Sequence, residues 1–225
     1  MQHSHRDPKL PCRCLAGMTL LLLACPARGP APLYSPFVDG FERPELGADW
    51  KNTGGPYRLA QGALVFSMAH NHPLWLQRRL PDDWRIDLDV TGHSPDGDLK
   101  VEVMGDGVRF ESDDDVRRDA IYMASGYRFI FGGWRNRLSV IARQNEHTWQ
   151  RDASVPRRTD VPVIPGHKYH WALSKKGGHL EWWIDGQRFL SLDDPQPLQG
   201  EGHDRFGFDG WETEAEFDNL RIAPL

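Results

Sequence analysis

The chain has 225 residues, a formal net charge of −5 and 11% aromatic residues, including nine tryptophans. No basic excess is present, which argues against nucleic acid as the main partner. This length suits one well-buried domain. Tryptophan side chains need extensive burial or a ligand to cover them, so some of these rings are expected to serve recognition.

The first 24 residues have the pattern of an export signal. Arg6, Lys9 and Arg13 form a basic region, and Leu15–Leu23 is a mostly apolar run too short to span a bilayer as a mature helix. Leu22-Leu23-Ala24-Cys25 resembles the bacterial lipobox, in which cleavage precedes the cysteine and its thiol receives a lipid. We therefore expect lipidation at Cys25 and an exported lipoprotein of the bacterial cell envelope. An ordinary secretory signal is the alternative.

Residues 25–36 are expected to form a tether, because four prolines favour a stiff extended chain. Cys12 and Cys14 would leave with the signal and Cys25 would carry the lipid, so no cysteine would remain for a disulfide. The mature domain is expected to span residues 37–225, with no nucleic-acid partner and with the membrane reached through the lipid.

From Phe37 onward, apolar and polar residues alternate over short runs separated by Gly, Pro, Asp and Asn. Trp84–Val90, Leu99–Val103, Tyr169–Leu173 and Leu180–Ile184 show the period of two that is typical of half-buried strands. Asp185-Gly186 has the composition of a tight hairpin turn. The pattern predicts an all-β fold with two packed antiparallel sheets. Three tryptophans lie on the apolar phase and are expected in the core: Trp84, Trp171 and Trp182.

Both ends of this region resemble the concanavalin A-like lectin/glucanase (laminin G-like jelly-roll) superfamily. The opening residues that carry the resemblance are Phe37-Val38-Asp39-Gly40-Phe41, Trp50, Gly54-Gly55, Tyr57, Gly62-Ala63-Leu64 and Leu74-Trp75-Leu76. The closing ones are Leu180-Glu181-Trp182-Trp183-Ile184-Asp185-Gly186 and Glu216-Phe217-Asp218-Asn219-Leu220-Arg221-Ile222. The resemblance implies a two-sheet jelly roll in an uncharacterised bacterial lipoprotein branch. It does not fix an activity, since the superfamily includes lectins, glycosidases and adhesion modules.

The opening is also similar to the 3-keto-disaccharide hydrolase-like group of secreted bacterial proteins. That group carries an Asn-Ser-Gly signature followed by a strand with an arginine. The signature is missing from this chain, and Gly126-Tyr127-Arg128-Phe129 occupies the comparable place.

Two tetrapeptides with the pattern F-x-G-W suggest a sugar site: Phe131–Trp134 and Phe208–Trp211. A saccharide offers apolar C–H faces to aromatic rings and hydroxyl pairs to amides, carboxylates and guanidinium groups. Glycine before each tryptophan lets the backbone approach a ligand closely. The expected ligand-binding residues are Trp134, Arg135, Asn136, Arg137, Asp209, Trp211, Glu212 and His72. The alternative is that both tryptophans merely cover the ends of the sandwich.

Catalysis and metal binding stay open. Glucanases of this superfamily place paired acids on one strand, and the nearest match here is Glu212, Glu214 and Glu216. Solvent-facing acids on a strand explain that row equally well. Asp96-Gly97-Asp98, Asp113–Asp115 and Asp209 offer oxygen ligands suited to calcium. His70 and His72 lack a third zinc ligand nearby.

The sequence therefore predicts non-catalytic glycan or polysaccharide binding at the cell envelope, with no required cofactor and calcium possible. A glycoside hydrolase or lyase is one alternative. A protein-interaction or structural envelope domain is another.

Overall fold

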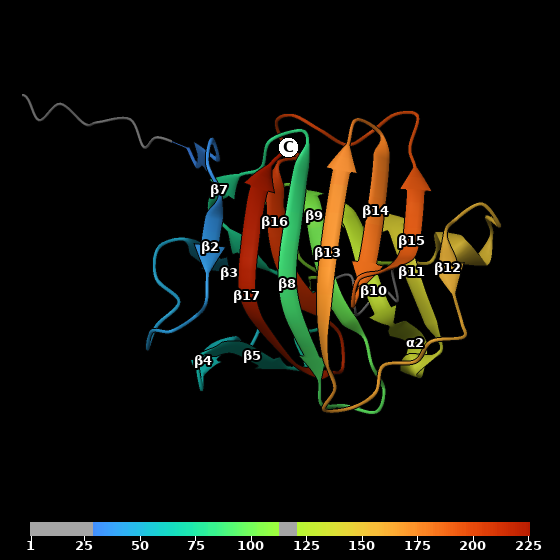
Figure 1. Ribbon diagram of the computed structural model, residues 1–225, viewed down its shortest axis with the longest axis horizontal. Coiled ribbons are helices and arrows are strands. Elements are labelled where there is room, and N and C mark those ends of the chain that lie inside the picture. The colour runs from blue at the N-terminus through green and yellow to red at the C-terminus, as the bar shows by residue number, and fades with distance from the viewer. Residues whose placement is uncertain (1–28, 113–120) are drawn as a thin grey trace, which may run out of the picture.

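The computed structural model describes residues 29–112 and 121–225 and places two antiparallel sheets face to face (Figure 1). This confirms the predicted all-β sandwich. The signal segment 1–24, the lipidation site Cys25 and the Asp113–Asp115 run lie outside the described residues. Within the described part of the chain, no helix is long and apolar enough to cross a membrane.

The front sheet in Figure 1 includes the last strand of the chain, which lies next to the sheet's central strand. Its order is β15 (Gln187–Asp193), β14 (His179–Ile184), β13 (Lys168–Lys176), β8 (Trp84–Gly92), β17 (Glu214–Pro224), β5 (Ala63–Ser67) and β4 (Arg58–Ala60), while β2 (Phe37–Asp39) pairs with β17.

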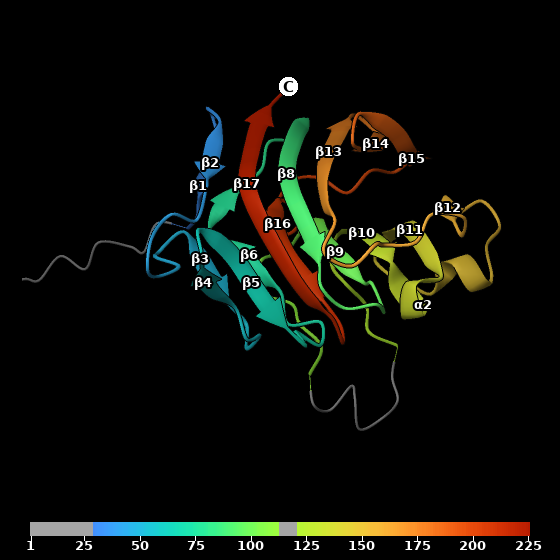
Figure 2. The same ribbon diagram turned by 60° about the horizontal axis from the view of Figure 1, so that its bottom comes forward.

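The back sheet has the order β12 (Arg157–Arg158), β11 (Leu138–Arg143), β10 (Tyr127–Gly132), β9 (Leu99–Gly105), β16 (Arg205–Gly210), β6 (Leu74–Leu76) and β3 (Trp50–Asn52). Figure 2 shows the short helix α2 (Gly133–Asn136) beside β11 and β12 at one end of the molecule, with β3 and β4 at the other. The segment Thr148–Gln150 forms one 3₁₀ turn (η1). Before the domain proper, β1 (Ala31–Pro32) runs parallel to β7 (Arg78–Arg79).

The core lies between the two sheets and is rich in aromatic rings. Trp84, Trp171 and Trp182 are fully buried, as the alternation predicted. The rings of Trp171 and Trp182 meet edge to face at 4.8 Å, and Phe131 of the back sheet contacts both. Edge-to-face pairs add a specific geometry to the area that each ring buries. These contacts fix how the sheets stack.

The predicted hairpin at Asp185-Gly186 is confirmed. It joins β14 to β15, and both residues have positive φ, 50° and 76°. A two-residue turn of this type matches the right-handed twist of the flanking strands. Trp183, one residue beyond the buried Trp182, is only partly buried, and its indole Nε1 donates to Glu181 Oε2 at 3.3 Å.

The opening motif around Asp39 pairs with the closing strand β17. Asp39 pairs with Leu220 of β17, and its buried carboxylate collects several donors. Oδ1 accepts from the Phe41 amide at 2.8 Å, and Oδ2 accepts from Trp50 Nε1 at 2.8 Å and from Arg43 Nη2 at 2.8 Å. Burial opposes ionisation of Asp39, but these hydrogen bonds outweigh it and lower its pKa below the ordinary value.

Replacing Asp39 with asparagine should destabilise the fold in a pH-dependent way. An amide NH₂ would face donors from Arg43 and Trp50, so we expect a loss of about 2 kcal/mol at pH 7. Because the folded-state pKa is depressed, the wild-type carboxylate stabilises the fold above its unfolded pKa. That contribution disappears as pH falls through the lower folded-state pKa. Urea unfolding at neutral and strongly acidic pH measures both effects.

The matched control is Asp160→Asn, whose carboxylate is exposed and pairs with Arg158 at 2.7 Å. It should change stability little. An Asp39→Asn variant as stable as the wild type at pH 7, or equally destabilised at both pH values, would contradict this account.

Candidate functional site

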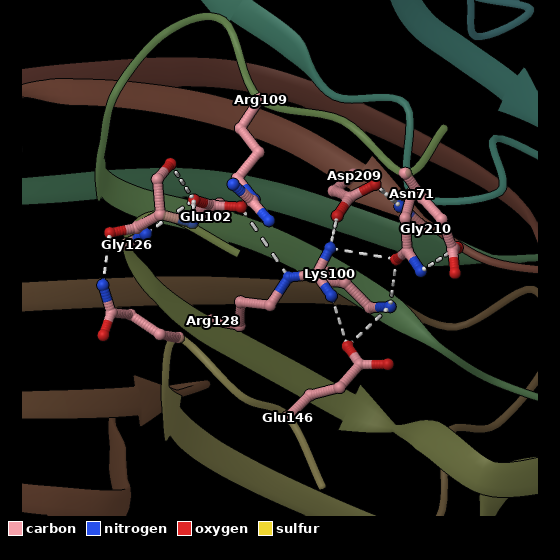
Figure 3. Close-up of polar contacts among 12 residues, drawn as sticks. Asn71, Lys100, Glu102, Arg109, Gly126, Arg128, Glu146, Asp209 and Gly210 are labelled. Atoms are coloured by element: carbon pink, nitrogen blue, oxygen red, sulfur yellow. Dashed lines mark hydrogen bonds and ion pairs between the residues drawn. The ribbon is translucent and has the colours of Figure 1, made fainter. Parts of the chain in front are cut away.

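A charged cluster lies on the outer face of the back sheet, on the side away from the core (Figure 3). Side chains alternate along a strand, so Leu99, Val101 and Val103 of β9 face the core while Lys100 and Glu102 face outward. In the strand register, Glu102 is opposite Arg128 of β10, and Lys100 is opposite Asp209 of β16. We define the charged cluster as Asp98, Lys100, Glu102, Arg128, Glu146 and Asp209, together with Asn71.

Arg128 is the centre of the cluster and is wholly buried. Its Nη1 donates to Glu146 Oε2, and its Nη2 donates to Asp209 Oδ2 and, at 2.9 Å, to Asn71 Oδ1. Its Nε lies 3.7 Å from Glu102 Oε2. Burial alone would lower the pKa of Arg128, but the surrounding carboxylates raise it well above its ordinary value. The guanidinium therefore stays charged and holds three strands and a loop together.

Lys100 is the second buried cation. Its Nζ donates to Asn71 Oδ1 at 3.1 Å and lies 3.3 Å from Glu146 Oε2 and 3.5 Å from Asp98 Oδ2. Burial opposes ionisation of Glu146, but Lys100, Arg128 and His147 outweigh it and lower its pKa to about 2. Asp98 is affected differently, because burial raises its pKa despite the attraction of Lys100. The cluster therefore combines four carboxyl groups with two cations.

Glu102 has a double role. Its Oε1 accepts from the amides of Ser125 at 3.0 Å and Gly126 at 2.7 Å and from Ser125 Oγ at 2.9 Å. These bonds fix the chain where it enters β10. Its buried Oε2 has no hydrogen-bond partner among the described residues. Burial raises the pKa of Glu102 to about 7, against the attraction of Arg128. Tyr122 covers this end, with its ring 4.8 Å from Arg128 Cζ.

The two F-x-G-W segments lie on either side of β9, next to the charged cluster. Phe131 and Gly210 both pair with Leu99, so β10 and β16 end at the same edge of the sheet. Asp98 connects the two ends. Its amide donates to Gly132 O at 2.9 Å, and its Oδ2 accepts from the Trp211 amide at 2.7 Å. The fold therefore brings together the two segments that the sequence predicted as the walls of one site.

The two tryptophans differ in their surroundings. Trp211 is partly buried, and its ring meets His70 edge to face at 4.8 Å. Trp134, also partly buried, meets the rings of His147 at 5.6 Å and Trp149 at 5.2 Å. It also packs on a small apolar patch formed by Ile130, Val140 and Ala142. Trp134 therefore has a packing role that Trp211 lacks.

The backbone around Trp134 is held in an uncommon conformation. Trp134, Arg135 and Asn136 all have φ between 53° and 61°. The Asn136 amide fixes this turn, donating to Pro95 O at 3.1 Å and Val163 O at 2.8 Å and accepting from the Val163 amide at 2.7 Å. Consecutive left-handed non-glycine residues persist only when their surroundings determine them. The predicted contact residue Asn136 is thus engaged by backbone groups, while Arg135 and Arg137 are exposed.

The remaining predicted ligand residues lie in different places. Asp209 is fully buried in the charged cluster, and Glu212 is exposed next to Trp211. His72 is partly buried away from the cluster's centre, with Nδ1 3.1 Å from Thr53 O and its ring stacked on Phe110 at 5.0 Å. These positions leave Trp134, Asp209, Trp211 and Glu212 next to or within one site.

Two of the three alternative catalytic acids, Glu214 and Glu216, occupy another surface, and Glu212 lies next to Trp211. Glu214 and Glu216 point away from the core on β17 of the front sheet, and they line a shallow cavity of about 230 Å³ with Arg58 and His93. The His93 Nε2 lies 3.6 Å from Glu216 Oε2. This surface is separated from the charged cluster by the whole sandwich.

Within residues 29–112 and 121–225, no group of three or more His, Cys, Asp or Glu side chains is placed to hold a metal ion. Asp98, one of the candidate calcium ligands, is engaged with Lys100 and the Trp211 amide. Asp209, another, pairs with Arg128.

Sequence reasoning missed most of the cluster: Asn71, Lys100, Glu102, Arg128 and Glu146. Lys100 and Glu102 fall on the polar phase of a strand, which normally faces water. The one available signal was Arg128, a lone charge in the apolar run Tyr127–Phe131. A buried arginine requires acidic partners, but those partners come from distant segments.

No protein-family model matches the chain, and no curated protein matches its sequence. Its architecture does match solved structures. A carbohydrate-binding module, CBM66 from Bacillus subtilis, superposes with a TM-score of 0.53 and 16% identity, covering 80% of this chain and 98% of the module. A Bacillus subtilis protein of unknown function with a galectin-like fold superposes with a TM-score of 0.61 and 14% identity, covering 84% of this chain and 94% of that protein.

A β-1,3-1,4-glucanase (lichenase) from a mouse hindgut metagenome also superposes, with a TM-score of 0.55 and 10% identity, covering 85% of this chain and the whole of the enzyme chain. At such identities the likeness concerns the fold and not the activity. The chain therefore has the concanavalin A-like jelly-roll fold of lectins and glucanases, as its opening and closing motifs predicted.

Proposed function

We propose that this protein binds a glycan, without cleaving it, on the outer face of the back sheet. The observation that carries the proposal is the charged cluster joined to both F-x-G-W segments through Asp98. A structural sandwich has no need of two buried cations on its outer face, because their desolvation is costly and hydrophobic residues would serve as well.

The chemistry of the site fits a saccharide. Carboxylates and amides accept and donate hydrogen bonds to vicinal hydroxyls, and a partly exposed indole offers a flat apolar surface to the sugar's C–H face. The groups that a ligand can reach are at the strand ends, where the side chains of Asp98 and Glu146 are 15% and 13% exposed. The cations behind them are at most 1% exposed. They orient the carboxylates rather than meet the ligand.

The comparisons support this proposal at the level of fold. One similar structure is a carbohydrate-binding module and another is a glucanase, so this sandwich carries saccharide sites in other proteins. We further propose that the domain acts at the bacterial cell envelope, exported by the signal at residues 1–24 and anchored through a lipid on Cys25. Residues 25–36 would then separate the domain from the bilayer, or the chain would be secreted if Cys25 is not modified.

Trp211→Ala should reduce glycan affinity at least about tenfold, or ~1.4 kcal/mol, because a central aromatic contact is lost. A glycan array, followed by calorimetric titration of the best wild-type ligand, measures the effect. Trp211 is the more informative position, since Trp134 also covers Ile130 and Val140 and its removal would disturb packing.

Trp183→Ala is the matched control, because Trp183 is a partly buried tryptophan on the front sheet, remote from the cluster. It should bind as the wild type does. Unchanged binding by Trp211→Ala, or equal losses in both variants, would refute the proposed site.

Glycoside hydrolysis at the same cluster is a second candidate, favoured by two carboxyl groups with opposed environments. Burial raises the pKa of Asp98 above its ordinary value, while the neighbouring cations lower that of Glu146 to about 2 despite burial. Such a contrast is typical of an acid and base pair. Both carboxyl groups face the Lys100 ammonium, at 3.5 and 3.3 Å, and both are partly exposed at the edge of the cluster.

Release of reducing sugar from the bound glycan distinguishes the two functions. Non-catalytic binding predicts no release by the wild type. A hydrolase predicts release that Asp98→Asn abolishes, while Glu214→Gln on the opposite sheet leaves it intact.

A further inference from the structure

The carboxylates at the reachable edge of the charged cluster each have an inner and an outer oxygen. The inner ones, Asp98 Oδ2 and Glu146 Oε2, both face the Lys100 ammonium, at 3.5 and 3.3 Å. No donor among the described residues bonds Asp98 Oδ1. Among the residues that the structure describes, Glu146 Oε1 has a single charged neighbour, the His147 ring nitrogen at 3.8 Å. The lysine thus fixes two carboxylates whose second oxygens remain available as acceptors.

The charge of the site is negative. Four carboxyl groups face two cations, and both cations are fully buried and already paired. Two further charges of opposite sign lie nearby: the buried Glu111 accepts from the Asn71 amide at 2.9 Å, and the exposed Arg109 has its guanidinium 6.0 Å from the Tyr122 ring. At the rim, outside the cluster, Arg135, Arg137 and Glu212 are exposed. An anionic ligand would meet carboxylates first and find no accessible cation within the cluster.

A further buried acceptor lies inside the same cluster. Glu102 Oε2 is fully buried and has no hydrogen-bond partner among the described residues, but Arg128 Nε, a donor that also has none, lies 3.7 Å from it. This acceptor and this donor compensate each other inside the cluster, so the acceptor oxygens left for a ligand are Asp98 Oδ1 and Glu146 Oε1 at its edge. The ligand is expected to supply donors rather than acceptors.

From this arrangement, and resting on the proposed glycan-binding function, we infer that the ligand is a glycan whose sugar units carry free amino groups. A protonated amine donates up to three hydrogen bonds, and those to a carboxylate are about twice as strong as neutral ones. Trp134 and Trp211, joined to the cluster's edge, offer ring faces that attract cations. Uronic or sulfated glycans are disfavoured for the converse reason.

The test compares three oligosaccharides of equal length by calorimetric titration: a glucosamine oligomer, its N-acetylated counterpart and a uronic acid oligomer. The full chain should bind the amine form at least about tenfold more tightly than the N-acetylated form at low salt. The difference should narrow at high salt, because screening weakens the attraction. The uronic acid oligomer should bind least.

Asp98→Asn and Glu146→Gln should each remove most of this preference. Asparagine at position 98 can still accept the Trp211 amide, and glutamine at position 146 can still accept from Arg128, so the outer oxygen's charge is what changes. Asp98→Asn keeps the test valid if Glu146→Gln fails to fold, as thermal unfolding would show. Glu45→Gln, an exposed acid before β3, is the control for net charge and should keep the full preference.

Equal affinity for the amine and N-acetylated forms would overturn the inference and leave the proposed function standing. The same holds if Glu45→Gln lost as much preference as Asp98→Asn, since the attraction would then be to the protein's net charge. If none of the three oligomers binds, and no neutral glycan on the array binds either, both the inferred amine preference and the proposed glycan binding would be overturned.

Discussion

The arrangement of side chains on the outer face of the back sheet depends on the burial of one guanidinium group, that of Arg128. Removing a charge from water costs several kcal/mol unless partners replace the lost hydration. Arg128 satisfies this requirement with carboxylates from three separate segments: Glu102 on β9, Asp209 on β16 and Glu146 in the loop after β11. Lys100 bonds the same Glu146, and Asn71 bridges the two cations through Oδ1. Loss of Asp209 or Glu146 would remove one of the two carboxylates that accept hydrogen bonds from the buried guanidinium.

This constraint explains how the site is positioned. The cluster links the central strands β10, β9 and β16 on one face, while the aromatic core links the same strands to the front sheet on the other. Asp98, at the start of β9, then attaches Gly132 and Trp211 to that rigid support. Binding groups built on strands hold their geometry better than groups on loops alone. The two tryptophan segments are therefore positioned by the sheet, although they lie beyond its strands.

The fold was predictable because its signals are local. Alternation along Trp84–Val90 and Leu180–Ile184 sets the core phase, and the Asp185-Gly186 turn sets the hairpin. The candidate site was less predictable from the sequence. The F-x-G-W repeat correctly indicated two segments that come together, because both follow strands adjacent to β9. Glu146 belongs to a polar loop with no pattern of its own, and its link to Arg128 arises only from the tertiary fold. Alternation alone also placed Lys100 and Glu102 in solvent, since it does not say when a polar face becomes covered.

The central claim is that glycan binding occurs beside the charged cluster and not elsewhere on the sandwich. Indole N–H signals in an NMR titration test it directly, since each tryptophan reports its own surroundings. Titration with a glycan that the protein binds should shift the indole N–H signals of Trp211 and Trp134, which lie next to the cluster. The signal of Trp183 on the front sheet should stay unchanged. Shifts confined to Trp183, or a bound glycan that perturbs neither Trp211 nor Trp134, would contradict the claim.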